Sequence, residues 1–144
     1  MTKKIFILDD EPMFLDWIED FAESVGYSVD FFTSINDANR KIKEALVDEY
    51  AALIIDLNVP ASSELESMIE QKAKVFQDFR GLFIAQQART KGIEGKKIIV
   101  YSVHDRLEVD EMCSRLGISY VPKGRAKVLK EKLNSIFGYS NHMN

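Results

Sequence analysis

The sequence predicts an α/β fold with a doubly wound, five-stranded parallel sheet in the order 2-1-3-4-5. Short apolar, β-rich segments alternate five times with segments whose apolar residues recur at helical spacing. A parallel sheet with helices on both faces is the architecture that such βα units form. The second strand segment is the least apolar and delivers no polar group comparable to those that follow the others, which fits an edge position.

The first two βα units are expected within the first 46 residues. The first strand (KIFIL, 4–8) ends at three acidic residues. Pro12 suits the first turn of the helix that follows, and Gly26 ends that helix. After a second strand at 27–32, Ser34 can cap the next helix. The apolar face of that helix is expected to contain Ile35, Ala38, Ile42, Ala45 and Leu46.

The third strand (ALII, 52–55) is a continuous apolar run that leads directly into Asp56. Such a run is typical of a strand that is buried on both faces. The fourth and fifth strands are expected at 97–102 (KIIVYS) and 118–122 (ISYVP), each followed by a helical pattern.

The composition is that of an ordinary globular protein of 144 residues, with 46% hydrophobic and 29% charged residues. The net charge of -4 argues against direct binding of nucleic acid. The single cysteine, Cys113, excludes an internal disulfide framework and fits a reducing compartment. No apolar run suits a signal peptide or a membrane span. We therefore expect a cytoplasmic protein without membrane insertion, with one domain at 1–138 and a disordered tail at 139–144.

Polar side chains follow four of the five predicted strands. Asp9 and Asp10 follow the first strand and Asp56 follows the third, whereas Ser102 ends the fourth and Lys123 follows the fifth. Because ligands of open parallel sheets bind outside the carboxyl ends of the strands, we expect these groups to lie together. Three carboxylates repel one another unless a cation lies among them. An oxygen-rich set without sulfur favours a hard cation, and Mg²⁺ is the natural choice beside phosphate.

A carboxylate nucleophile, a metal, a lysine and a hydroxyl together form a phosphoryl-transfer site. In this interpretation Asp56 attacks phosphorus, Lys123 and Mg²⁺ neutralise charge on the equatorial oxygens, and Ser102 donates a hydrogen bond. The alternative is that these are ordinary polar residues at strand ends. Acidic residues commonly follow strands, but the joint pattern favours the phosphoryl-transfer site.

The chain resembles the receiver domain of bacterial two-component response regulators. Four segments carry the resemblance: the acidic pair in ILDDE (7–11), the phosphoacceptor segment IIDLNVP (54–60), the hydroxyl residue that ends IIVYS (98–102) and the lysine of YVPK (120–123). The segment GLFIAQQAR (81–89) is similar to the usual start of the third helix of the family. The resemblance covers nearly the whole chain and implies the flavodoxin-like fold of receiver type.

The resemblance also implies roles for individual residues. Asp56 would be the phosphorylated aspartate. Asp9, Asp10 and Asp56, together with the backbone carbonyl of Asn58, would bind Mg²⁺, and Lys123 would contact the phosphoryl group.

Ser102 and Tyr120 would form a switch. Phosphorylation adds nearly two negative charges and three acceptor oxygens. Ser102 would move towards the phosphoryl group and vacate space that Tyr120 can fill. The change would reach the face formed by the helix after the fourth strand, the fifth strand and the last helix. The alternative for Tyr120 is a half-buried strand aromatic.

The implied function is that of a signalling module that takes a phosphoryl group from a histidine kinase or a phosphotransfer protein and catalyses only its own phosphorylation and dephosphorylation. The sequence leaves open which downstream protein is the target and whether the chain forms a homodimer. It also leaves open whether the chain is a stand-alone receiver or part of a larger regulator. Two other functions compete. One is a Mg²⁺-dependent phosphohydrolase with an aspartyl-phosphate intermediate, although Asn58 stands where the haloacid-dehalogenase type has a second acid. The other is a phosphorylation-independent binding module, against which the complete set of site residues argues.

Two departures from the family pattern stand out. Gly124 follows the lysine where the family usually has proline. Residues 61–80 form an insertion, and its apolar positions predict an extra helix or a longer third helix, with Ser62 and Ser63 as candidate caps. The segment either buries its apolar residues on its own domain or serves as a lid near Asp56 or a docking helix. The apolar pattern runs through Leu65, Met68, Ile69, Lys72, Val75, Phe76 and Phe79.

Overall fold

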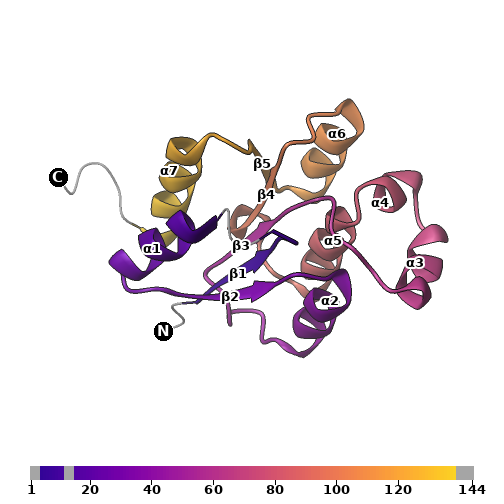
Figure 1. Ribbon diagram of the computed structural model, residues 1–144, viewed down its shortest axis with the longest axis horizontal. Helices are drawn as coiled ribbons and strands as arrows, with labels where there is room; N and C mark the ends of the chain where they lie inside the picture. The colour runs from indigo at the N-terminus through magenta and orange to yellow at the C-terminus, as the bar shows by residue number, and fades with distance from the viewer. Residues whose placement is uncertain (1–3, 12–14, 139–144) are drawn as a thin grey trace.

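A computed structural model describes residues 4–11 and 15–138 (Figure 1). The five strands form one parallel sheet in the order β2-β1-β3-β4-β5, so the predicted fold class and strand order are confirmed. In chain order the elements are β1 (Lys4–Leu8), α1 (Asp16–Ser24), β2 (Ser28–Phe32), α2 (Ile35–Glu44), β3 (Ala52–Ile55), α3 (Ser63–Glu70), α4 (Lys74–Asp78), α5 (Gly81–Lys91), the 3₁₀ helix η2 (Gly95–Lys97), β4 (Ile98–Ser102), α6 (Leu107–Leu116), β5 (Ser119–Pro122) and α7 (Ala126–Phe137).

Alternate residues of the strands contribute to two hydrophobic cores, one on each face of the sheet. On one face, Ile5 and Ile7 of β1 are buried under α1 and α7. On the other, Phe6 and Leu8 of the same strand are buried under α2, α5 and α6. Figure 1 shows these two layers on opposite sides of the sheet. The burial of both faces explains why β3 consists entirely of apolar residues.

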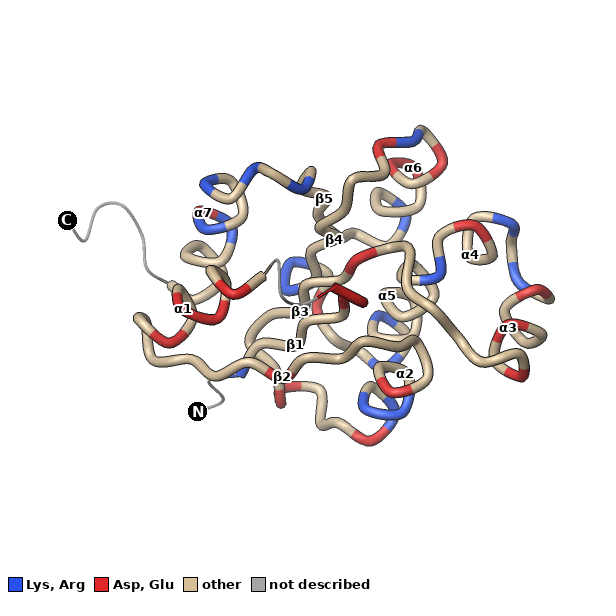
Figure 2. The backbone as a smooth tube through the Cα atoms, in the orientation of Figure 1, with Lys and Arg blue, Asp and Glu red and all other residues tan. Residues whose placement is uncertain are grey.

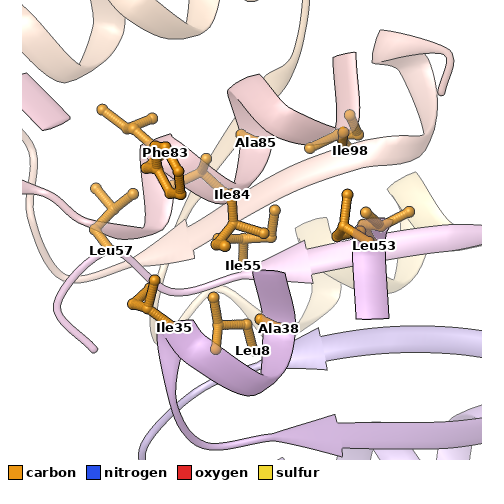
Figure 3. Close-up of a cluster of buried hydrophobic side chains, with 14 of the residues drawn as sticks. Leu8, Ile35, Ala38, Leu53, Ile55, Leu57, Phe83, Ile84, Ala85 and Ile98 are labelled. Carbon is orange, nitrogen blue, oxygen red and sulfur yellow. The ribbon is translucent and has the colours of Figure 1, made fainter. Parts of the chain in front are cut away.

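Figure 3 shows the core between the sheet and α2 and α5. Ile35 and Ala38 of α2 lie beside Leu8 of β1, and Ile84 of α5 lies close to Ile55 of β3 (Figure 3). All five side chains are inaccessible to solvent. Each large aliphatic side chain buried in this way contributes about 1.5–3 kcal/mol. This packing fixes the ends of β1 and β3, from which the acidic residues of the candidate site follow.

Residues 61–80 form two short helices, α3 and α4, rather than the single helix that the apolar spacing predicts. The hydroxyl of Ser62 accepts a hydrogen bond from the Leu65 amide at 3.3 Å and caps α3, as predicted. Most of the predicted apolar positions are buried in the core shared with α2, α5 and α6, whereas Met68 is 40% exposed and Lys72 is exposed. The segment therefore buries most of its apolar residues on its own domain. The buried positions are Leu65, Ile69, Phe76 and Phe79.

Two expectations about α2 have different outcomes. Ser34 caps the helix as predicted, because its hydroxyl accepts a hydrogen bond from the Asp37 amide at 3.2 Å. Leu46 is 71% exposed, so its assignment to the apolar face was wrong. The helix ends at Glu44, and the extended backbone of Ala45 turns the following residue away from the core. Pro12 and the tail at 139–144 lie outside the described residues.

In the part of the chain that the structure describes, no helix is both long and apolar enough to cross a bilayer.

Candidate functional site

The ends of β1 and β3 place two acidic residues side by side. Leu8 of β1 pairs with Ile55 of β3, so Asp9 and Asp56 are the first residues beyond this parallel pair. The Asp56 amide donates a hydrogen bond to the Leu8 carbonyl at 2.8 Å. Acidic positions gather where these two strands end (Figure 2). The register of the sheet thus fixes the separation of the two carboxylates.

Three carboxylates converge at this edge of the sheet. Asp9, Asp10 and Asp56 each offer an oxygen, and these oxygens lie within 4.8 Å of one another. Asp9 and Asp56 are buried, whereas Asp10 is exposed. Backbone amides fix one oxygen of each buried carboxylate: Glu11 donates to Asp9 Oδ1 at 2.8 Å, and Leu57 donates to Asp56 Oδ1 at 2.9 Å. The other oxygen of each, Oδ2, faces Lys123.

Lys123 places a positive charge between the two buried acids. Its Nζ lies 2.8 Å from Asp9 Oδ2 and 3.4 Å from Asp56 Oδ2, and its side chain is 25% exposed. Burial alone would lower the pKa of Lys123, but the carboxylates of Asp9 and Asp56 outweigh it and raise the pKa above its usual value. The lysine is therefore protonated at neutral pH and compensates part of the negative charge of the cluster.

The Asp56 carboxyl is in an environment that favours its uncharged form. Burial raises its pKa above the usual value of an aspartate, and the nearby charge of Asp9 adds to this effect. Lys123, the Leu57 amide and the Ser102 hydroxyl act in the opposite direction but do not cancel it. A further cation at this edge would therefore favour ionisation of Asp56.

The Tyr120 side chain of β5 contacts the backbone at the end of β4, where Ser102 lies. Ser102 is inaccessible to solvent, and its hydroxyl accepts a hydrogen bond from the His104 amide at 3.3 Å. The half-buried Tyr120 hydroxyl lies 3.0 Å from the Ser102 carbonyl oxygen and 2.8 Å from that of His104, so one donor serves two acceptors. Burial raises the pKa of Tyr120 as well. The predicted switch pair thus shares one segment of backbone after β4.

Gly124 has a φ of 92°, which explains the departure from the family pattern after Lys123. Proline is restricted to a φ near -65° and could not adopt this conformation. Asn58 is exposed between the buried Leu57 and Val59, and the role of its carbonyl remains a prediction.

Sequence reasoning missed the contact between the start of α5 and the end of β3. The Gly81 amide donates a hydrogen bond to the Leu57 carbonyl at 2.9 Å. A Cβ at Gly81 would overlap the Asp56 carbonyl oxygen and lie 2.9 Å from the Leu57 Cα. A glycine at the first position of a helix is a weak signal of such a close approach. Gly81 thus belongs to the site through its backbone.

Arg80 and Phe79 connect the segment of α3 and α4 to the rim of the site. Arg80 Nε donates to the Val59 carbonyl at 2.8 Å, and its guanidinium lies 3.4 Å from a Glu66 carboxylate oxygen in α3. The Phe79 ring packs edge-on against the imidazole of His104, with a centroid separation of 5.5 Å. No interaction of this segment with the Asp56 carboxylate is found among the described residues.

The donor set suits a hard divalent cation. Asp9, Asp10 and Asp56 supply only oxygen atoms as ligands. Backbone amides hold the Asp9 and Asp56 carboxylates in place, and the separations of the three carboxylate oxygens allow a single ion to reach all of them. These three residues could therefore bind Mg²⁺, with the exposed Asp10 on the solvent side.

No protein-family model and no curated protein matches the chain. Its structure is similar to solved receiver domains. These include a response regulator receiver domain protein (CheY-like) from Methanospirillum hungatei JF-1, with a TM-score of 0.68 and 20% identity over 97% of this chain and 100% of that one. Another is the receiver domain of the sensor histidine kinase PA1611 from Pseudomonas aeruginosa PAO1, which was solved with a magnesium ion in its active site cleft. Its TM-score is 0.66, and the sequence identity is 20% over 96% of this chain and 99% of that one.

The response regulator protein TrrA from Thermotoga maritima, solved in complex with Mg²⁺-BeF, gives a TM-score of 0.66 and 23% identity over 94% of this chain and 99% of that one. At these identities the likeness concerns the fold. The chain has the receiver-domain fold, and a fold by itself does not determine the function.

Proposed function

We propose that this protein is a phosphoacceptor receiver domain that takes a phosphoryl group on Asp56. The observation that carries the proposal is the convergence of Asp56 with two further carboxylates and Lys123 at the carboxyl edge of a receiver-type sheet. A fold alone supports many functions, but this combination of nucleophile, acidic cluster and cation is suited to phosphoryl transfer.

In the proposed reaction, a carboxylate oxygen of Asp56 attacks the phosphorus of a donor. With a phosphohistidine donor the P–N bond breaks, and the imidazole leaves after it takes a proton. The nucleophile has to be ionised, and the positive charge of Lys123 favours that form. Lys123 and the Ser102 hydroxyl would then contact phosphoryl oxygens. Mg²⁺, when bound by Asp9, Asp10 and Asp56 with the Asn58 carbonyl, supplies further positive charge to the phosphoryl oxygens.

The proposed partners are a histidine kinase or a phosphotransfer protein, because a buried carboxylate needs an activated donor that reaches the edge of the sheet. Phosphorylation would draw Ser102 towards Asp56 and change the backbone that Tyr120 contacts. The altered surface would be the face formed by α6, β5 and α7, on which a downstream protein would bind.

The experiment is intact-mass spectrometry after incubation with acetyl phosphate and Mg²⁺. We expect a gain of one phosphoryl group in the wild type, no gain in Asp56→Asn or without Mg²⁺, and a slower gain in Asp10→Asn. Asp20→Asn is the matched control, because Asp20 is an exposed acid on α1. An equal gain in Asp56→Asn would refute the proposal. Steady turnover of a phosphomonoester would favour the phosphohydrolase instead.

A further inference from the structure

Two neighbouring cavities lie at the amino-terminal edge of the sheet, at the other end of the strands from Asp56. Tyr27, Ala51 and Lys97, which line them, directly precede β2, β3 and β4, and Ser119 is the first residue of β5. The cavities have volumes of about 360 and 400 Å³. They share Lys97 and Ile136 as lining residues, so they adjoin, and we call the two cavities together the amino-edge groove.

The first cavity is basic. It is lined by Lys96, Lys97 and Lys132 and by one acid, Glu94, which forms an ion pair with Lys96 at 3.2 Å. Within residues 4–11 and 15–138, no carboxylate lies within ion-pair distance of Lys97 or Lys132. Two ammonium groups therefore remain uncompensated in a protein whose net charge is -4.

Hydroxyl groups accompany these lysines. Lys132 Nζ donates a hydrogen bond to Ser119 Oγ at 3.2 Å, which directs the ammonium across from α7 to the start of β5. Ser135 lines the same cavity and lies three residues after Lys132, on the same side of α7. Ammonium groups and hydroxyls that converge in this way suit the oxygen atoms of a phosphate group.

The second cavity is aromatic. Tyr27, Tyr50 and Phe137 line it, together with the carboxylate of Asp48. The rings of Tyr27 and Phe137 stack with a centroid separation of 4.0 Å. The Tyr50 hydroxyl donates to Asp30 Oδ2 at 2.7 Å, which fixes its ring in place. The Tyr50 ring is only 2% exposed and belongs to the core, so a planar base would contact the half-buried pair of Tyr27 and Phe137. Asp48 could accept a hydrogen bond from an amino or ribose hydroxyl group.

We propose that the amino-edge groove binds a nucleotide, with its phosphate in the basic cavity and its base in the aromatic cavity. Each part has a volume within the range of small-molecule sites. The order of the two parts matches the chemistry of a nucleoside monophosphate, in which one anionic group is joined to one aromatic group. The proposal does not depend on phosphorylation of Asp56, because the groove lies at the opposite edge of the sheet.

Isothermal titration calorimetry on the full chain tests this proposal, with AMP, GMP, adenosine and inorganic phosphate as probes. We expect a nucleoside monophosphate to bind more tightly than either adenosine or phosphate. Lys132→Ala should weaken nucleotide binding roughly tenfold, which is the effect of losing one charge-assisted hydrogen bond. Phe137→Leu should weaken binding of the nucleotide and leave binding of phosphate unchanged.

Lys130→Ala is the matched control on the same helix. The Lys130 ammonium lies 5.5 Å from the centre of the Trp17 ring, away from the groove. Thermal unfolding of each variant checks that its fold is intact. Equal affinity of wild type and Lys132→Ala would overturn the proposal. So would phosphate binding as tightly as the nucleotides, or a loss of affinity in Lys130→Ala equal to that in Lys132→Ala.

Discussion

Replacement of Gly81 by alanine tests how closely α5 is packed against the end of β3. The new Cβ would overlap the Asp56 carbonyl oxygen and lie 2.9 Å from both the Asp56 carbonyl carbon and the Leu57 Cα. Carbon atoms in ordinary contact are about 3.5–4.0 Å apart. All three obstructing atoms belong to the backbone, so the helix or the strand end has to move.

The expected loss of stability follows from two opposing effects. Overpacking a well-packed site costs about 3 kcal/mol at the upper end of its usual range, and this end applies because the backbone cannot yield as a side chain would. Replacing a helical glycine by alanine returns about 1 kcal/mol. The net decrease in the free energy of unfolding of Gly81→Ala is therefore about 2 kcal/mol, which corresponds to a fall in melting temperature of roughly 6–8 °C.

A second glycine provides a matched control. A Cβ at Gly95 would overlap the Gly117 carbonyl oxygen and lie 2.9 Å from the Gly117 carbonyl carbon, but this contact lies at the opposite edge of the sheet from Asp56. Urea unfolding should give similar losses for both variants. Phosphorylation by acetyl phosphate, followed by intact mass, should slow at least about tenfold in Gly81→Ala, because displacement of a nucleophile costs rate steeply. The rate in Gly95→Ala should be unchanged.

Two results would refute this reasoning. If Gly81→Ala kept the wild-type stability, the close approach would not constrain the fold. If the variant lost stability and kept the wild-type rate of phosphorylation, the contact would not position Asp56.

Three further predictions concern the charge, the hydrogen bonds and the packing around the site. Because burial raises the pKa of Asp56, its carboxylate destabilises the fold above that pKa. Asp56→Asn should therefore be more stable than wild type in urea at pH 7.5, and this gain in stability should vanish below about pH 4. A variant less stable than wild type at pH 7.5 would contradict this. Tyr120→Phe should cost about 1 kcal/mol and speed amide exchange after β4, whereas unchanged exchange would argue against the observed hydrogen bonds. Ile69→Ala should lower the free energy of unfolding by about 2–4 kcal/mol, and Met68→Ala should lower it by less than about 1 kcal/mol. Equal small losses of stability in thermal unfolding would show that α3 is not packed on the domain.

The sheet could be predicted from the sequence because each strand carries its own signal. The apolar run of β3 indicates a strand that is buried on both faces, as in a parallel sheet. In a parallel sheet the carboxyl ends of the strands lie at one edge, so the polar residues at the ends of β1, β3, β4 and β5 are expected to meet there. The structure places Asp9, Asp56 and Lys123 together at this edge, as the topology predicts. Burial and the resulting pKa of Asp56 required the three-dimensional structure.

The break between α3 and α4 could not be predicted, because the apolar spacing continues across it. A single helix and two short helices both place Leu65 and Phe79 on an apolar face, and only packing against α5 and α6 distinguishes them. The contact of Gly81 with the Asp56 carbonyl was also hidden, since it joins positions far apart in sequence through backbone atoms. Leu46 was assigned by spacing alone, and the end of α2 at Glu44 decided its exposure.

The hydrogen bond between Leu57 and Gly81 closes residues 58–80 into a loop whose two ends meet beside Asp56. The chain leaves the sheet at Leu57 and returns to the same point at Gly81, with only 2.9 Å between the carbonyl oxygen and the amide nitrogen. The free energy of closing such a loop depends only weakly on its length. The length of the segment could therefore change at its exposed turn between α3 and α4, at residues 71–73, while its buried residues and Asp56 keep their positions. This turn is a natural point at which to graft a binding peptide or a fluorescent reporter.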